Sequence, residues 1–158
     1  MSHKKFEDLG INKRKKREYE ELSYLVAFVY NTISGRVEKM LRQNKISLAR
    51  FNILLILKYK GGDSGLSQTG ITKSLIVSDG NITRVLDRME KEKLIIRDND
   101  PGDRRTNIIR ISLNGSDLIE KLWPVYDRII KESLSVITSV EQKKMIKTFY
   151  KIALPLTQ

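Results

Sequence analysis

Residues 78–113 read SDGNITRVLDRMEKEKLIIRDNDPGDRRTNIIRISL, and the hydrophobic period changes within this stretch. In the first part, apolar side chains recur at i, i+3, i+4 and i+7, the spacing of one helix face (Ile82, Val85, Leu86 and Met89). After Leu94 the period is two, which predicts a strand over 94–97 and another over 107–113, with Ile109, Ile111 and Leu113 on one face. We therefore expect a helix followed by a β-hairpin.

The predicted helix has an identifiable start and a second, polar face. Ser78 is the expected N-cap, because its hydroxyl can accept a hydrogen bond from a first-turn N–H. Asp79 would follow where the positive end of the helix dipole favours an acid. Polar side chains recur on another face at helical spacing (Asn81, Arg84, Arg88 and Lys91). Amide and guanidinium groups make bidentate contacts with adenine and guanine edges, so this face is a candidate base-reading surface.

The predicted hairpin has a basic tip. Residues 99–102, Asn-Asp-Pro-Gly, form a turn sequence, since proline presets φ and glycine accepts positive φ. Arg104 and Arg105 follow, and Asp103 could brace one of the two guanidiniums. A basic tip beside a groove-reading helix can enter the neighbouring minor groove, where the potential is negative. Together these features predict a winged helix that binds DNA.

The stretch 66–113 resembles the DNA-binding domain of the MarR family of transcription regulators. The wing sequence Asp103-Arg104-Arg105 carries the likeness most specifically, and residues 77–90 are similar to the family's recognition helix nearly position by position. The resemblance implies DNA contacts from the recognition helix (Ser78, Asp79, Gly80, Asn81, Thr83, Arg84 and Arg88) and from the wing (Asp103, Arg104 and Arg105). It further implies that Arg105 enters the minor groove and that Arg104 contacts the backbone.

The chain departs from the family pattern at two places. After Leu113 the family usually has Thr, with Gly three residues later, whereas this chain has Asn114 and Asp117. Asn is an equally good cap, so we expect a helix to begin there. Gly70 lies in the predicted helix 67–75, where the family usually has Ala, and weakens that helix by up to about 1 kcal/mol.

Amphipathic helices are predicted on both sides of this region. On the N-terminal side, apolar spacing predicts a long helix over 19–43 (Leu22, Val26, Val29, Ile33, Val37 and Met40). Ser47 is the expected cap of a second helix, which ends at Gly61-Gly62. On the C-terminal side we expect a helix over 115–137, bent at Pro124. A last helix is predicted over 140–153, with one apolar face (Met145, Phe149 and Ile152).

The predicted fold class is mainly α with a small β-hairpin wing. The chain of 158 residues is expected to form a single domain, 1–158. Its winged-helix DNA-binding region would span 48–113, flanked by helices over 19–43 and 115–154. The resemblance to the family implies that these flanking helices interlock with those of a second subunit, giving a homodimer.

Charge and composition narrow the possible partners and chemistry. The net charge is +11, which favours a polyanionic partner, yet residues 78–105 carry seven basic and seven acidic side chains. Specificity would then depend on the face that the arginines occupy. The chain has no cysteine and one histidine, His3, so we expect no thiol sensing, no metal site and no cofactor. The serine in Gly62-Asp63-Ser64-Gly65 has no neighbouring imidazole base, so catalysis is not expected.

No apolar run reaches membrane-spanning length, and the N-terminus has no hydrophobic leader, so a cytoplasmic protein is expected. We predict a homodimeric, sequence-specific transcription regulator, most often a repressor, that binds a pseudo-palindromic operator. The resemblance also implies release by a small aromatic anion, with Tyr24, Phe28 and Trp123 as candidate cleft residues, although ordinary core or dimer contacts are the stronger explanation of these three residues. Two alternatives stay open: a winged helix that serves as a protein-interaction module, and a ligand-binding protein without specific DNA binding.

Overall fold

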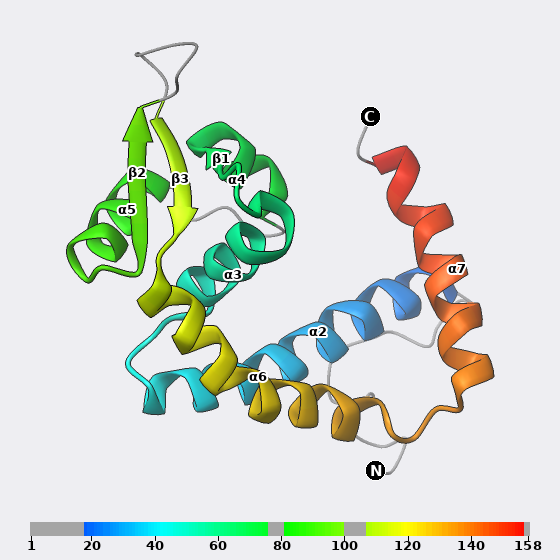
Figure 1. The fold of residues 1–158 in the computed structure, drawn as a ribbon. Coiled ribbons are helices and arrows are strands. Elements are labelled where there is room, and N and C mark those ends of the chain that lie inside the picture. Colours follow the sequence, from blue (N-terminus) through cyan, green and yellow to red (C-terminus); the bar gives the residue numbers. More distant parts are fainter. Residues whose placement is uncertain (1–17, 76–80, 100–106, 157–158) are drawn as a thin grey trace.

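The computed structural model describes residues 18–75, 81–99 and 107–156, which form helices around a small antiparallel sheet (Figure 1). In chain order the elements are α2 (Glu18–Gln43), α3 (Leu48–Ile56), the π-helix η1 (Leu57–Gly61), β1 (Leu66–Ser67), α4 (Gln68–Ser74), α5 (Ile82–Lys91), β2 (Ile95–Asn99), β3 (Asn107–Ile111), α6 (Leu113–Leu134) and α7 (Ser139–Leu156). The predicted fold class is confirmed. None of the helices within the described ranges has the length and apolar character needed to cross a membrane.

The sheet has the strand order β1-β3-β2, and both pairs of strands are antiparallel. β2 and β3 form the predicted hairpin, with Ile95 opposite Ile111 at its base. β1 adds a third strand on the other side of β3, where Leu66 lies opposite Ile109. Because β1 leads directly into α4, the hairpin is attached to the helix pair α4 and α5.

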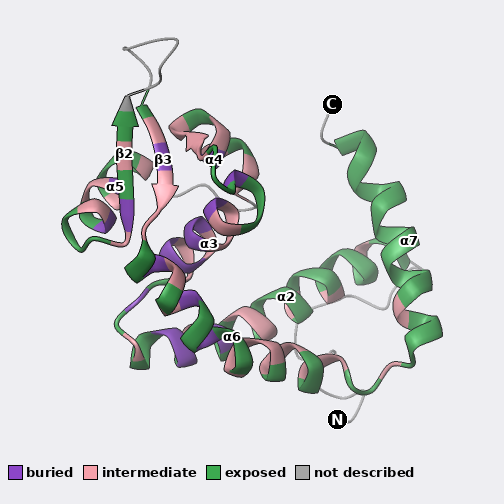
Figure 2. Cartoon of the chain, in the orientation of Figure 1, coloured by how far each residue is buried: buried purple, intermediate pink, exposed green. Residues whose placement is uncertain are grey.

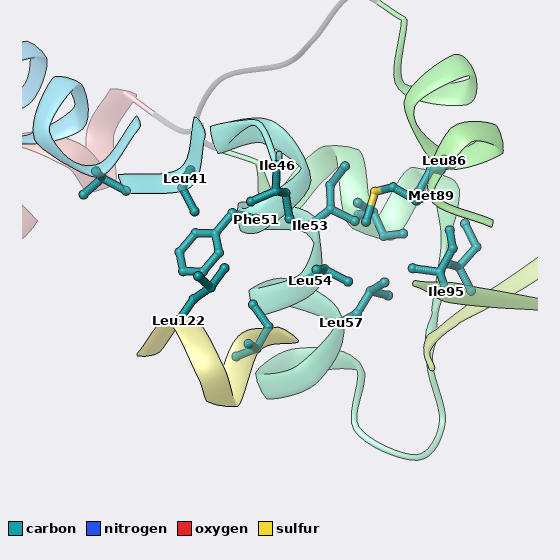
Figure 3. Packing of buried hydrophobic residues seen from close by; sticks show 14 of the residues in the cluster. Leu41, Ile46, Phe51, Ile53, Leu54, Leu57, Leu86, Met89, Ile95 and Leu122 are labelled. Carbon is teal, nitrogen blue, oxygen red and sulfur yellow. The ribbon is translucent and has the colours of Figure 1, made fainter. Parts of the chain in front are cut away.

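The hydrophobic core lies in the winged-helix region, with α3 near its centre (Figure 3). Its buried side chains come from the end of α2, from α3 and η1, from α4 and α5, from the sheet and from the first half of α6 (Val37, Met40, Leu41, Ile46, Phe51, Ile53, Leu54, Leu57, Ile71, Leu86, Met89, Ile95, Ile109, Ile119 and Leu122). By contrast, α7 has no buried residue, and the first half of α2 is largely exposed (Figure 2). One chain therefore encloses its core around the winged helix and leaves its outer helices uncovered.

Two predicted helix starts are wrong, because other residues form the caps. The N-cap of α5 is Asn81, whose side chain accepts a hydrogen bond from the backbone N–H of Arg84 at 3.3 Å, and not Ser78. The N-cap of α6 is Ser112, which accepts from Gly115 N at 3.0 Å, and not Asn114. The strand β3 consequently ends before this cap.

Because of these boundary shifts, one residue of the predicted second strand belongs to a helix. The sequence predicts Leu113 in the second strand, on one face with Ile109 and Ile111, but it is the first residue of α6 and is 78% exposed. The cap predicted at Ser47 is confirmed, since its hydroxyl accepts a hydrogen bond from the N–H of Arg50. Ser67 caps α4 in the same way, accepting from the N–H of Gly70. The helix after Ser47 changes to a π-helix over Leu57–Gly61 and has ended by Gly62, as predicted.

Gly115 lies at the closest contact between α6 and the winged helix. A Cβ at this position would lie 2.2 Å from the backbone oxygen of Leu94, 3.0 Å from Ile111 and 3.1 Å from Leu54. The Leu94 oxygen also accepts a hydrogen bond from the N–H of Ser112 at 3.1 Å, so it cannot move away without cost. Only glycine lets the first turn of α6 pack this closely against the base of the hairpin.

Gly115→Ala should therefore destabilise the protein by about 3 kcal/mol, the upper end of the usual cost of overpacking. The matched control is Gly35→Ala in the exposed part of α2, where a Cβ would meet nothing within 4 Å. That variant should gain up to about 1 kcal/mol, because alanine favours a helix over glycine. Urea unfolding of both variants measures the difference, and equal stabilities would contradict the close contact at Gly115.

Candidate nucleic-acid interface

The recognition helix α5 buries one face and exposes the other, as its sequence predicts. Leu86 and Met89 are completely buried against the core, and Ile82 and Val85 pack at its edge. The opposite side carries exposed polar residues (Thr83, Arg84, Arg88 and Lys91). The apolar contacts thus fix the rotation of α5 about its axis and present these polar side chains to solvent.

A side-chain contact joins α4 to the exposed face of α5. The amide of Gln68, in the first turn of α4, donates from Nε2 to Oγ1 of Thr83 at 2.9 Å. The two residues line a polar hollow between α4, α5 and the strands of the sheet (Ser67, Gln68, Thr69, Thr83, Arg97, Asn107 and Ile109). Thr83, one of the predicted DNA-contacting residues, is therefore held in place by α4.

Arg97 of β2 connects the hairpin to the side of α5. Its guanidinium lies 2.7 Å from Oδ1 of Asp87 and 3.4 Å from Oε2 of Glu90, which are three residues apart on the helix. The Arg97 side chain is only 22% exposed, so this ion pair is partly shielded from water. Both acids of α5 thus pair with β2, and within the described residues neither pairs with Arg84 or Arg88.

Two more ion pairs involve the hairpin and the C-terminal end of α5. Arg110 of β3 pairs across the hairpin with Asp98, and its Nε donates to the backbone oxygen of Asp63 at 2.9 Å. Glu92, the C-cap residue of α5, pairs with Arg50 of α3 and accepts from Nε of Arg88 at 2.9 Å. The hairpin and the end of the recognition helix are thus both tied to the body of the domain.

The pKa of Glu92 follows from these contacts. Partial burial alone would raise this pKa, but the hydrogen bonds from Arg50 and Arg88 outweigh burial and leave the pKa below the ordinary value of 4.5. Glu92 is therefore ionised at neutral pH and carries the negative charge that the two guanidiniums require.

The ion pairs explain how a region with equal numbers of acidic and basic residues can still expose a basic face. All four acids described between Asn81 and Asn99 are paired with arginines (Asp87, Glu90, Glu92 and Asp98). In the described part of the chain, no carboxylate pairs with Arg84 or Lys91. The exposed face of α5 is consequently positive even though the region is neutral overall.

The predicted DNA-contacting residues are only partly within the described structure. Thr83, Arg84 and Arg88 lie on the exposed face of α5, as predicted. Asn81 is exposed at the start of the helix, where its side-chain oxygen is used as the cap. The remaining predicted residues lie outside the described residues (Ser78, Asp79, Gly80, Asp103, Arg104 and Arg105).

The three candidate effector residues are not brought together within one chain. Trp123 of α6 contacts Tyr59 and Tyr126, with ring centroids 5.7 and 5.4 Å apart. Tyr24 and Phe28 lie in the N-terminal half of α2, whereas the residues of α2 that reach the core lie in its C-terminal half. α2 and α6 run antiparallel (Figure 1), and Arg36 of α2 pairs with Glu132 of α6 at 2.8 Å. From the rise per residue of a helix, Tyr24 and Trp123 therefore lie on opposite sides of this pair, on the order of 30 Å apart. The expectation of one cleft lined by all three residues therefore fails for a single subunit.

Sequence reasoning did not single out Arg50, Glu92 or Arg97, although all three orient the recognition helix. The available signal was Arg50, a charged residue in the otherwise largely apolar helix LARFNILLI. A buried arginine requires a partner, and the residue that could serve is found only when the fold is known.

The described residues contain no group of three or more His, Cys, Asp or Glu side chains placed to bind a metal ion.

The chain is similar in sequence and in structure to known bacterial transcription regulators. Residues 46–106 match the model of the MarR family. The chain is 27% identical over 138 residues to the HTH-type transcriptional regulator MhqR of Bacillus subtilis, covering 87% of this chain and 93% of that protein. Among solved structures, AbsC, a MarR family transcriptional regulator from Streptomyces coelicolor, superposes with a TM-score of 0.80 at 18% identity, covering 92% of this chain and 98% of AbsC. The MepR–DNA complex of S. aureus superposes with a TM-score of 0.74 at 25% identity, covering 84% and 96%.

The contribution of Glu92 to folding should depend on pH. Since the folded pKa of Glu92 lies below 4.5, its stabilising effect is complete above that value and is lost as the pH falls through the folded pKa. The difference in unfolding free energy between wild type and Glu92→Gln should therefore shrink between about pH 6 and about pH 3. Denaturant unfolding across this range measures it, and a difference that is independent of pH would show that the carboxylate charge is not what matters.

Proposed function

Because the chain belongs to the MarR family, we propose that it is a homodimeric transcription regulator that recognises a specific DNA sequence through α5 and the hairpin. The observation that carries this proposal is the exposed basic face of a helix whose two acids, Asp87 and Glu90, both pair with Arg97 of β2. Arg84 and Arg88 have the chemistry to contact guanine in the major groove. DNA as the partner also places the expected site of action in the cytoplasm.

The uncovered helices support a dimer. Large apolar side chains are exposed on α2 (Tyr19, Leu22, Tyr24, Val26, Val29 and Tyr30) and on α7 (Val140, Met145, Ile146, Phe149, Tyr150, Ile152 and Leu156). Such long apolar faces are unfavourable in water and are typical of protein interfaces. A second copy of the chain, which offers the same two helices, is the partner that we propose. The two recognition helices would then face successive major grooves, about one helical turn apart.

Binding to an operator would most simply repress transcription by excluding polymerase from a promoter. Release by a small aromatic anion stays a prediction of the family resemblance. Because Tyr24 and Trp123 lie far apart in one chain, a cleft that uses both would have to combine residues of two subunits.

DNA recognition can be tested by competition between the gene's own upstream DNA and random duplex of equal length. We expect a preference of at least about a thousandfold for one fragment, and affinity that falls steeply with salt concentration. Arg84→Ala should reduce this preference, by about 1 to 3 kcal/mol if Arg84 reads a base. Arg128→Ala, which removes an exposed arginine from α6, is the matched control and should leave the preference unchanged.

The alternatives have distinct outcomes in the same experiment. Absence of DNA binding at low salt would contradict the proposal and favour a protein-interaction or ligand-binding module. Equal, salt-sensitive binding to every fragment would indicate attraction to phosphates without sequence recognition.

The dimer can be tested by light scattering of the intact protein. We expect a mass of twice the 18.3 kDa of one chain. Phe149→Asp should shift the population toward monomer, because a carboxylate cannot be buried in an apolar interface without a partner. Lys147→Asp lies on the opposite side of α7 and changes the charge more, yet should leave the mass unchanged. If both variants stay dimeric, another surface joins the subunits.

A further inference from the structure

Glu92 follows the last turn of α5, and its two carboxylate oxygens hold two different arginines. Oε1 accepts from Nε of Arg88, one helical turn earlier, at 2.9 Å. Oε2 pairs with Nη2 of Arg50, which belongs to α3. The carboxylate thus links a buried side chain of the domain body to an exposed side chain of the recognition helix.

Arg50 makes this link rigid. Only 6% of Arg50 is exposed, and its buried Nε has no hydrogen-bond partner in the described part of the chain. A buried guanidinium is costly unless it is paired, and within the described residues Glu92 is the carboxylate that pairs with it. The ion pair with buried Arg50 therefore restricts the Glu92 side chain, which cannot change rotamer as freely as an ordinary surface glutamate.

Helix stability does not explain a glutamate at this position. The C-terminal end of a helix carries a partial negative charge, which repels a carboxylate and favours lysine or arginine. Glu92 nevertheless occupies the C-cap position of α5. Any stabilisation by Glu92 must therefore come from its ion pairs with the two arginines and not from the end of the helix.

The consequence for Arg88 is a restricted orientation. Its side chain is 73% exposed, but Nε is engaged by Glu92, so the planar guanidinium cannot rotate freely. In the described structure its two terminal Nη groups have no protein partner. A bidentate contact with O6 and N7 of guanine needs two N–H donors in one plane, and fixing them beforehand reduces the entropy lost on binding.

We propose that Glu92, anchored by buried Arg50, is a positioning residue for sequence recognition that holds Arg88 in the orientation to read one guanine in each half-site. Glu92 does not itself contact DNA. This inference rests on the proposed function and adds to it a base preference and the residue that sets it.

Glu92→Gln separates the two links. Glutamine keeps the length of the side chain but has one acceptor oxygen and one NH₂ donor. The buried guanidinium of Arg50 requires the acceptor, which leaves the NH₂ group facing the Nε–H of Arg88, with which it cannot bond. The variant should therefore keep Arg50 satisfied and the fold intact while it frees Arg88.

The first readout is the affinity for a panel of operators in which each base pair of one half-site is changed in turn. In wild type, one G·C pair should be strongly preferred, and in Glu92→Gln that single preference should fall by about tenfold. Arg88→Ala should abolish the same preference, and adding Glu92→Gln to Arg88→Ala should change nothing further. Glu38→Gln, which removes the carboxylate of another i,i+4 pair, with Arg42, is the matched control and should keep the wild-type profile.

Two results would overturn the inference. One is an unchanged base profile in Glu92→Gln, and the other is a uniform rise in affinity for all sequences, which would mean that Glu92 merely repels phosphates. A wild-type protein without any preferred sequence would instead contradict the proposed function.

A second readout needs no DNA and so separates these failures. The Nε–H proton of Arg88, observed by NMR in the intact protein, should exchange with water slowly in wild type and fast in Glu92→Gln. Fast exchange in wild type would contradict the positioning of Arg88 whatever the protein binds.

Discussion

Burial of Leu86 and Met89 against the core determines where every other side chain of α5 lies. Because the helix can turn only one way to bury these two residues, its polar residues are fixed on the solvent side and its acids at the flanks. The ion pairs with Arg97 and Arg50 then hold the second half of the helix to the hairpin and its C-terminal end to α3. The proposed recognition of DNA by the exposed face requires that α5 be held rigidly, since a loosely held helix would not present a fixed pattern of donors.

Charge in this region serves positioning as much as attraction. The acids of the recognition region, taken alone, would weaken the approach of a polyanion. Their pairing with arginines from neighbouring elements turns that cost into a set of cross-links between α3, α5, β2 and β3. Generic attraction to phosphates can come from the remainder of a chain with a net charge of +11, and selectivity from the few arginines that stay exposed.

Much of the fold could be predicted from the sequence because it rests on local periodicity. The helical stripe of α5, the hairpin and the cap at Ser47 depend on neighbouring residues, and these predictions hold. The failures arise where two good caps compete. The sequence analysis names Ser78 and Asn114 as caps, whereas the structure uses Asn81 and Ser112. All four residues are good caps, so local chemistry does not choose between them.

The parts of the site that could not be predicted depend on contacts between distant segments. Arg50 and Glu92 are 42 residues apart, and no periodicity connects them. The separation of Tyr24 from Trp123 follows from the antiparallel course of α2 and α6, which their spacing in sequence does not reveal. Residues 66–113 nonetheless carried enough of the family pattern for the family to be identified, a prediction that the match over 46–106 confirms.

The central claim is that α5 reads DNA from the major groove, and methylation interference on a bound operator tests it most directly. Methylation at N7 of guanine blocks the major-groove edge and leaves the minor groove unchanged. We predict two groups of guanines whose methylation prevents binding, with centres about one helical turn apart. Binding that tolerates methylation at every guanine would contradict the account, since the arginines of α5 would then have no role in the major groove.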